Sequence, residues 1–153
     1  MPLPSTGPPT STGHVRGAAA SITLSGVSSI QVADQTFVVA SGAAVAEVLA
    51  DRSRWRRWWP DLQLEVREDR ADKGIRWVVR GPLTGTMEVW LEPSLDGVLL
   101  HYFLHGEPEP RHTLTPRAAA AANRARRVAG KRMSFEVKAL LEAGRPAGVT
   151  PAA

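Results

Sequence analysis

The sequence predicts an α+β domain in which an antiparallel sheet is followed by one long C-terminal helix. Three observations lead to this class. Residues 62–105 contain successive segments in which apolar and polar side chains alternate, the pattern of strands with one buried face. Residues 116–142 carry apolar side chains at helical spacing. Residues 41–59 contain two short helical segments, and the second carries three of the chain's five tryptophans.

Length and composition are those of one globular domain. The chain has 153 residues, of which 43% are hydrophobic and 22% are charged, enough for one sizeable core. The ends, residues 1–20 and 144–153, are rich in small residues and proline and are predicted to be disordered, which leaves residues 21–143 for the domain. The chain has no cysteine, so disulfides, thiolate nucleophiles and cysteine metal sites are excluded.

We expect a soluble, cytoplasmic protein. The N-terminal stretch MPLPSTGPPTSTG has neither the charged start nor the apolar core of a secretory signal, and no apolar run approaches the length of a membrane span. The net charge is +4, and basic residues crowd residues 52–57 and 117–138. Such charge can attract nucleic acid or anionic lipid. No nucleic-acid recognition motif accompanies it, so solvated helix faces are the simpler interpretation.

The N-terminal half of the domain begins with a strand and two short helices. Residues 30–39 are rich in β-branched side chains and are predicted to form the first strand. Ser41 marks the start of a short helix, whose apolar side chains share one face. Residues 51–59 continue as a second helical segment, which Pro60 ends.

The tryptophans of the second helical segment are expected to have a structural role. An element of this length cannot bury indole rings by itself, so the rings must pack against a larger surface, here the mouth of a curved sheet. The residues to which we assign this structural role are Trp55, Trp58 and Pro60.

Four strands are predicted between Leu62 and the long helix. In the first three, apolar side chains alternate with polar ones, and the last is apolar on both faces. Glycine, proline and aspartate mark the turns between them. The predicted ranges are 62–67, 75–80, 84–92 and 98–105.

The long helix is predicted to run from Pro116 to Glu142, with Thr115 as its N-cap and Gly144 after its end. Its apolar stripe has small side chains at first and bulkier ones from Met133 onward. Small side chains let a helix approach a sheet closely, whereas larger ones can leave a cavity. A plain core contact fits the pattern equally well. The predicted stripe comprises Ala118, Ala122, Ala125, Ala129, Met133, Val137 and Leu140.

This order of elements resembles the START-like, polyketide cyclase/dehydrase superfamily (SRPBCC), whose fold is called the helix grip. The resemblance covers about residues 30–142. The matching positions lie in the two short helices, the penultimate hairpin and the last strand; they are residues 44–49, Asp51, Trp55, Trp58, Pro60, Gly85, residues 91–93 and residues 97–104.

The resemblance implies a curved antiparallel sheet wrapped around the C-terminal helix. The family usually has six strands where this chain has four, so the sheet is expected to be shortened. The segment ASITLSGV, within residues 18–27, could supply a replacement strand, although its glycine and serines argue against this.

The resemblance also implies a hydrophobic pocket between the sheet and the C-terminal helix. Such a pocket would bind a lipid, an isoprenoid or a polyketide-like molecule, and no cofactor is expected. Each lining side chain is also expected to be a core residue. The predicted lining comprises Trp77, Met87, Val89, Leu100, Tyr102, Leu104, Met133 and Val137.

Catalysis in such a pocket needs acids, bases or hydrogen-bond donors inside an apolar cavity. Tyr102, the only tyrosine, is the one catalytic candidate because its hydroxyl could orient a carbonyl; a buried ring with a hydrated hydroxyl is the simpler interpretation. His101 and His105 lie four residues apart along a strand with no third ligand, so no metal site is expected. We therefore expect a binding protein or carrier. A cyclase or dehydratase is the alternative, and a protein interaction module is the second alternative.

The outer face of the sheet is expected to form a homodimer interface. An antiparallel sheet covered on one side normally has polar side chains on the other. Here alternation places apolar residues there, and contiguous exposed apolar surface commonly marks an interface. The residues concerned are Val78, Trp90, Leu99 and Phe103. An N-terminal segment folded over this surface is the alternative.

Overall fold

The computed structural model describes residues 28–143, which form five strands, three α-helices and one short 3-10 helix. Our expectations for the ends of the chain, including the replacement strand within residues 18–27, fall outside this range. The strands are β1 (Ile30–Val38), β2 (Gln63–Asp69), β3 (Gly74–Arg80), β4 (Leu83–Ser94) and β5 (Gly97–Pro108). The helices are α2 (Gly42–Leu49), α3 (Arg52–Trp58) and α4 (Pro116–Glu142), and the 3-10 helix is η1 (Ala71–Lys73).

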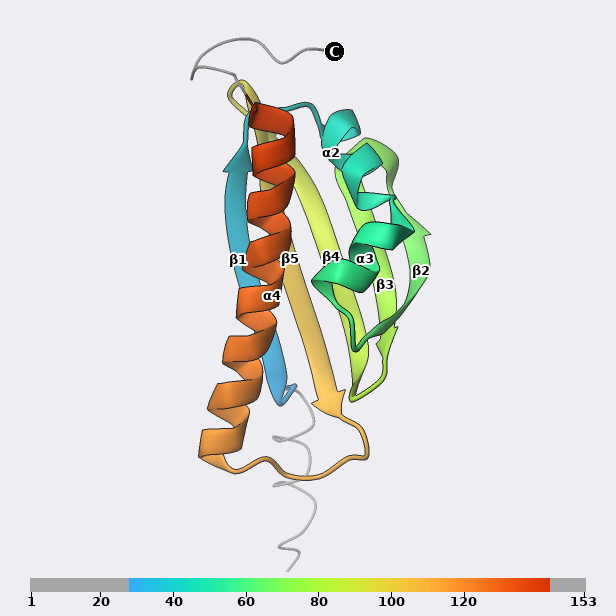
Figure 1. The fold of residues 1–153 in the computed structure, drawn as a ribbon, viewed down its shortest axis with the longest axis vertical. Helices are drawn as coiled ribbons and strands as arrows, with labels where there is room; N and C mark the ends of the chain where they lie inside the picture. Colours follow the sequence, from blue (N-terminus) through green and yellow to red (C-terminus); the bar gives the residue numbers. More distant parts are fainter. Residues whose placement is uncertain (1–27, 144–153) are drawn as a thin grey trace, which may run out of the picture.

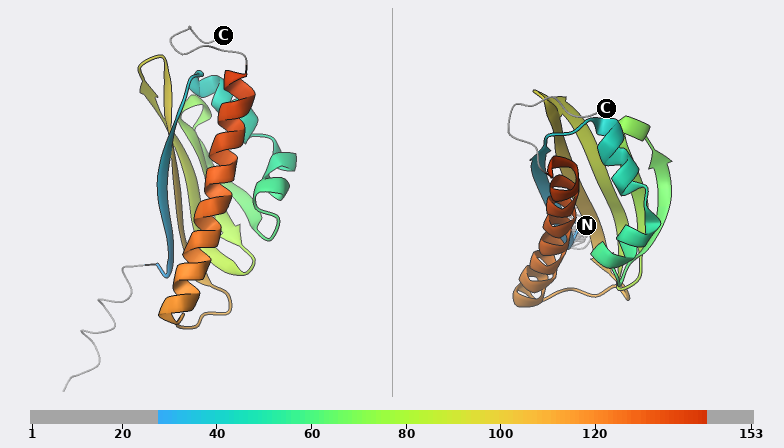
Figure 2. Two further views of the ribbon diagram at one scale, coloured as in Figure 1. Left: turned by 60° about the vertical axis from the view of Figure 1, so that its left-hand side comes forward. Right: turned by 45° about the horizontal axis from the view of Figure 1, so that its top comes forward.

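The five strands form one antiparallel sheet in the order β1-β5-β4-β3-β2. Figure 1 shows α4 lying lengthwise beside β1 and β5, while α2 and α3 lie over the half of the sheet that ends in β2. Figure 2 shows the helices on the same side of the curved sheet. The prediction of an α+β helix grip with two short helices and four strands after Leu62 is therefore confirmed.

Local sequence explains where the three helices begin. Ser41, Asp51 and Thr115 each precede a helix, and the side-chain oxygen of each accepts a hydrogen bond from a backbone N–H two or three residues further on, at 3.0 to 3.2 Å. These bonds satisfy donors that have no partner within the helix. Pro116 takes the first position of α4, where its missing N–H costs nothing.

The buried face of α4 differs in part from the predicted stripe. Four of the seven predicted residues are buried or half-buried; they are Ala122, Ala129, Met133 and Val137. The other three are exposed; they are Ala118, Ala125 and Leu140. Each residue turns the helix by about 100°, which carries these three away from the centre of the buried face. Gly130 and Ser134 lie on that face instead.

Polar side chains of α4 cover the free edge of β1. Asn123 and Glu142 accept hydrogen bonds from backbone N–H groups of β1 and of the residue that follows it, while Lys131 and Lys138 donate to β1 carbonyls, at distances of 2.8 to 3.3 Å. An open strand edge is a template for pairing with another chain. These four side chains therefore take the place of a neighbouring strand.

Glu136 of α4 fixes α3. The indole Nε1–H of Trp58 donates to Glu136 Oε2 at 2.6 Å, and the guanidinium groups of Arg54 and Arg57 pair with Oε1 of the same carboxylate. Charge-assisted hydrogen bonds of this kind are stronger than neutral ones. One carboxylate of α4 thus holds three side chains of α3.

Gly130 allows α4 to pack directly on the ring of Tyr102. A methyl group at position 130 would lie 2.2 Å from Cε1 and 2.5 Å from Cδ1 of that ring, closer than real contacts allow. A glycine inside a helix costs up to about 1 kcal/mol relative to alanine. The helix contains one here because the tyrosine ring occupies the space where a Cβ would be.

Replacing Gly130 by alanine should lower the free energy of unfolding by about 1–3 kcal/mol, because the added methyl group overpacks the core. The change should be neutral or stabilising by up to about 1 kcal/mol in a Tyr102→Leu background, where the smaller side chain leaves room and the helix propensity of alanine dominates. Urea denaturation of the four proteins of this cycle measures both effects. An equal cost in the two backgrounds would show that Gly130 does not accommodate the ring.

Trp58→Phe should lower the free energy of unfolding by about 1.5–3 kcal/mol, because the aromatic ring is kept while the hydrogen bond to the Glu136 carboxylate is lost. Phe135→Leu is the control. That ring is 55% exposed on α4, away from the outer face of the sheet, so its replacement should change stability by less than about 0.5 kcal/mol. If both variants unfold at the urea concentration of the parent, the bond to Glu136 does not stabilise the fold.

Candidate ligand-binding site

The eight residues predicted to line a pocket lie together on the helix-covered face of the sheet. Six come from β3, β4 and β5 and two from α4, and each is at most 1% exposed. The strand register places Met87 between Trp77 and Leu104, and Val89 beside Tyr102. The structure therefore brings all eight into one core, and their contact with a ligand stays a prediction.

Trp59, one of the three tryptophans expected to pack against the sheet, belongs to the same core. It caps the C-terminus of α3 and is 1% exposed. Its ring centroid lies 5.7 Å from that of Trp77 and 6.2 Å from that of Tyr102, to which it is nearly parallel. Two adjacent residues within a helix do not point the same way. The helix ends between Trp58 and Trp59, which turns both rings inward.

Trp55 and Trp58, predicted to be structural, are both buried. The Trp55 ring meets Trp77 edge to face at 5.5 Å, and its Nε1–H donates to the carbonyl of Leu49 at 2.6 Å. Trp58 meets Trp59 edge to face at 5.6 Å. Pro60 is exposed and follows the end of α3. We call Trp55, Trp58, Trp59, Trp77 and Tyr102 the aromatic cluster.

Three donors of the aromatic cluster have no oxygen acceptor among residues 28–143. The Nε1–H groups of Trp59 and Trp77 make no hydrogen bond there, and the Tyr102 hydroxyl donates to Sδ of Met87 at 3.2 Å. A thioether is a weak acceptor. A buried donor without a partner costs about 1–3 kcal/mol. The core therefore holds donors that its own described residues do not satisfy.

Burial keeps the Tyr102 hydroxyl protonated. Desolvation raises its pKa far above the ordinary value, and the nearby Trp59 indole and the positive charge of Arg126 oppose this only in part. At neutral pH the group can donate a hydrogen bond but cannot act as a base. In the described part of the chain, the buried core contains no carboxylate or histidine that could take that role.

Polar contacts join α3 and its following turn to α4; we call this junction the α3–α4 seam. Glu136 supplies one set of contacts, described above. Arg126 supplies the other through two hydrogen bonds to the carboxylate of Asp61, at 2.9 and 2.7 Å. The same bonds hold the pKa of Asp61 below its usual value. Because Asp61 is half exposed, this pair is the surface type that water and salt weaken.

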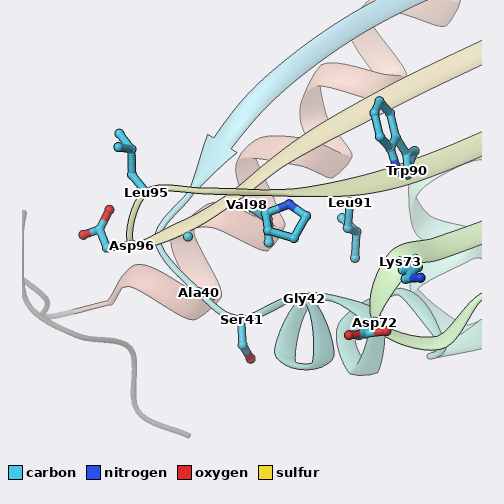
Figure 3. A pocket seen from close by; sticks show the side chains of 12 residues that line it. Ala40, Ser41, Gly42, Asp72, Lys73, Trp90, Leu91, Leu95, Asp96 and Val98 are labelled. Carbon is cyan, nitrogen blue, oxygen red and sulfur yellow. The ribbon is translucent and has the colours of Figure 1, made fainter.

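An open cleft of about 630 Å³ lies at another place, where three turns meet at one end of the sheet. Figure 3 shows Leu95 and Asp96 at the tip of the β4–β5 hairpin and Asp72 and Lys73 at η1. None of the eight predicted pocket residues lines this cleft. The sequence interpretation missed it because only folding brings these turns together, and no local pattern marks them.

Two of the residues expected on the outer face, Trp90 and Phe103, form an aromatic stack with His101. The ring of Trp90 lies 4.6 Å from that of His101, and the ring of Phe103 is parallel to His101 at 6.2 Å. Nε2 of His101 lies 2.8 Å from a carboxylate oxygen of Glu92. Trp90 is 40% exposed, and Val78 and Leu99, like Phe103, are half-buried.

No group of three His, Cys, Asp or Glu side chains between residues 28 and 143 could hold a metal ion. No helix in the same range has both the length and the apolar character needed to cross a membrane.

Comparison with known proteins shows similarity at the level of structure. No protein-family model matches the chain, and neither does any curated protein. The chain is similar to the Aha1 dimer from Colwellia psychrerythraea, with a TM-score of 0.52 and 13% identity over 76% of this chain and 99% of that one. It is also similar to the protein Mll3558 from Rhizobium loti, with a TM-score of 0.54 and 18% identity over 69% of this chain and 95% of that one.

A third similar structure is DynU16, described as a putative protein in the dynemicin biosynthetic locus. The TM-score is 0.50 and the identity 17%, over 76% of this chain and 48% of that one. Identities this low establish the fold and nothing finer. The chain therefore shares its fold with these structures, the helix grip that its order of elements predicted.

Proposed function

We propose that this protein binds or carries a small hydrophobic molecule, of the lipid, isoprenoid or polyketide-like class, between its sheet and α4. One observation carries the proposal: a continuous apolar and aromatic inner face of the sheet is covered by α3 and α4, which meet each other through polar contacts. Ion pairs between partly exposed groups contribute about 0–1 kcal/mol each. The Arg126–Asp61 part of the α3–α4 seam can therefore open at modest cost and admit a ligand to the aromatic cluster, while the stronger bond between Trp58 and Glu136 keeps α3 on α4.

A cyclase or dehydratase that uses the same interior is the alternative. It would employ Tyr102 as a hydrogen-bond donor to a carbonyl, since the raised pKa of that hydroxyl rules out general-base catalysis at neutral pH. The absence of a carboxylate or histidine from the buried part of the described core favours binding over catalysis. An interaction module is the second alternative, and it rests on the outer face.

Titration with the neutral fluorophore N-phenyl-1-naphthylamine tests the binding function. The parent should take up the probe saturably, and native mass spectrometry should show one molecule per chain. Val89→Trp should abolish uptake, because Val89 is fully buried on the inner face and a larger side chain fills that space. The far-ultraviolet circular dichroism spectrum should stay largely unchanged.

Two further variants make this test independent of the folding of Val89→Trp. Trp59→Leu removes ring volume from the aromatic cluster and should tighten probe binding. Trp90→Leu is the matched control on the outer face, and probe affinity should stay the same. Uptake that persists in a folded Val89→Trp variant, or that disappears in Trp90→Leu, would place the probe elsewhere and overturn the proposal.

We also propose that the protein forms a homodimer through the outer face of the sheet. The residues concerned are Val78, Trp90, Leu99 and Phe103. The exposure of Trp90 and the stacked rings beside it support this. Side chains of α4 cover the edge of β1, which disfavours pairing through that edge. The similar structure from Colwellia psychrerythraea is described as a dimer.

Sedimentation velocity at tens of micromolar tests the dimer. The parent should sediment as a dimer, and Phe103→Glu should sediment as a folded monomer, because a charge in an apolar interface is costly. Phe135→Glu is the matched control, since Phe135 is 55% exposed on α4, away from the outer face. That variant should remain dimeric. A monomeric parent would end the dimer proposal.

A further inference from the structure

We propose that the ligand of the interior carries a neutral hydrogen-bond acceptor, such as a ketone or quinone oxygen, and that Trp59, Trp77 and Tyr102 recognise this oxygen. The inference rests on the proposed function, because it names the chemistry of the molecule bound at the same site. It is carried by the hydrogen bonds that the aromatic cluster makes and those that it does not make.

The four tryptophans of the aromatic cluster divide into two pairs. The Nε1–H groups of Trp55 and Trp58 each donate to a protein oxygen at 2.6 Å, a carbonyl in one case and a carboxylate in the other. Those of Trp59 and Trp77, which are 1% and 0% exposed, have no acceptor within residues 28–143. Buried donors in folded proteins are nearly always satisfied. The unsatisfied Nε1–H groups of Trp59 and Trp77 therefore need an explanation.

The unsatisfied donors lie close to one another. Trp59 contacts the rings of both Trp77 and Tyr102, with centroid separations of 5.7 and 6.2 Å. The Tyr102 hydroxyl donates to the sulfur of Met87, which sits beside Trp77 in the strand register, and the Trp59 indole lies near the same hydroxyl. The three rings that carry these donors thus belong to one contiguous group.

All three groups offer hydrogens, so the ligand must offer lone pairs. An indole N–H can only donate, and burial holds the Tyr102 hydroxyl in its protonated form. The acceptor should also be neutral. An anion would lose its hydration in an interior where the nearest arginine, Arg126, is already paired with Asp61. A carbonyl oxygen on an apolar skeleton meets both requirements.

Fluorene and 9-fluorenone test this chemistry, because they differ only in the replacement of one CH₂ by C=O. Burial of apolar surface alone favours fluorene, since the carbonyl loses its hydration on transfer to an apolar site. Hydrogen bonds from the three donors to the carbonyl oxygen should instead make fluorenone the more tightly bound of the two compounds. The parent should bind fluorenone about tenfold more tightly, the change expected for roughly one net hydrogen bond, as measured by isothermal titration calorimetry.

Variants identify the groups responsible. Tyr102→Phe removes only the hydroxyl and should erase much of the preference for fluorenone while leaving the affinity for fluorene unchanged. Trp59→Phe and Trp77→Phe remove the indole N–H, keep an aromatic ring and should weaken the preference in the same way. Ser134→Ala is the matched control, because it deletes another fully buried hydroxyl, from α4, and should leave the preference intact.

The outcomes separate this inference from the proposed function. If neither compound binds saturably, the proposed function fails and the inference fails with it. If both bind and fluorene binds at least as tightly as fluorenone, the function stands and the inference is overturned. A preference for fluorenone that survives in all three variants would also overturn the assignment of the donors. A preference that falls in them and survives in Ser134→Ala supports it.

Discussion

The contact between the Tyr102 ring and the backbone of α4 at Gly130 sets the position of the whole helix. Because no Cβ intervenes, α4 lies close enough to the sheet for its polar side chains to reach beyond it. On one side they bond to the free edge of β1, and on the other Glu136 bonds to α3. The strand edge and the cover of the aromatic cluster therefore depend on how closely the helix packs at one residue.

Five of the eleven basic residues of α3 and α4 have ion-pair partners at short range. The sequence suggested either a charge field that attracts polyanions or solvated helix faces. In the structure, Arg54 and Arg57 bind Glu136, and Arg126 binds Asp61. Lys131 pairs with Asp34 and, like Lys138, also donates to a backbone carbonyl of β1. Part of the positive charge that crowds these segments is thus matched by specific partners that join helix to helix and helix to sheet.

Local patterns predicted the elements well and their mutual packing less well. The caps Ser41 and Thr115 and the alternation of the strands are visible in short stretches of sequence, so the fold could be predicted from them. The burial of Trp59 depends on the helix ending one residue earlier, and the cleft at η1 depends on three turns meeting in space. The predicted stripe of α4 failed at Leu140, because spacing alone does not fix which part of a helix faces the sheet.

In most of a stable fold, the packing of a side chain and the hydrogen bonds of its polar atoms favour the same position. The aromatic cluster departs from this rule. Its rings fill the core, yet two indole donors and a hydroxyl are placed where the described residues offer them no oxygen. Such departures are expected where function competes with stability. Each unsatisfied donor costs about 1–3 kcal/mol in the ligand-free protein, and an acceptor from a ligand removes that cost. Binding would then also stabilise the fold, since a molecule that binds the native state alone shifts the unfolding equilibrium.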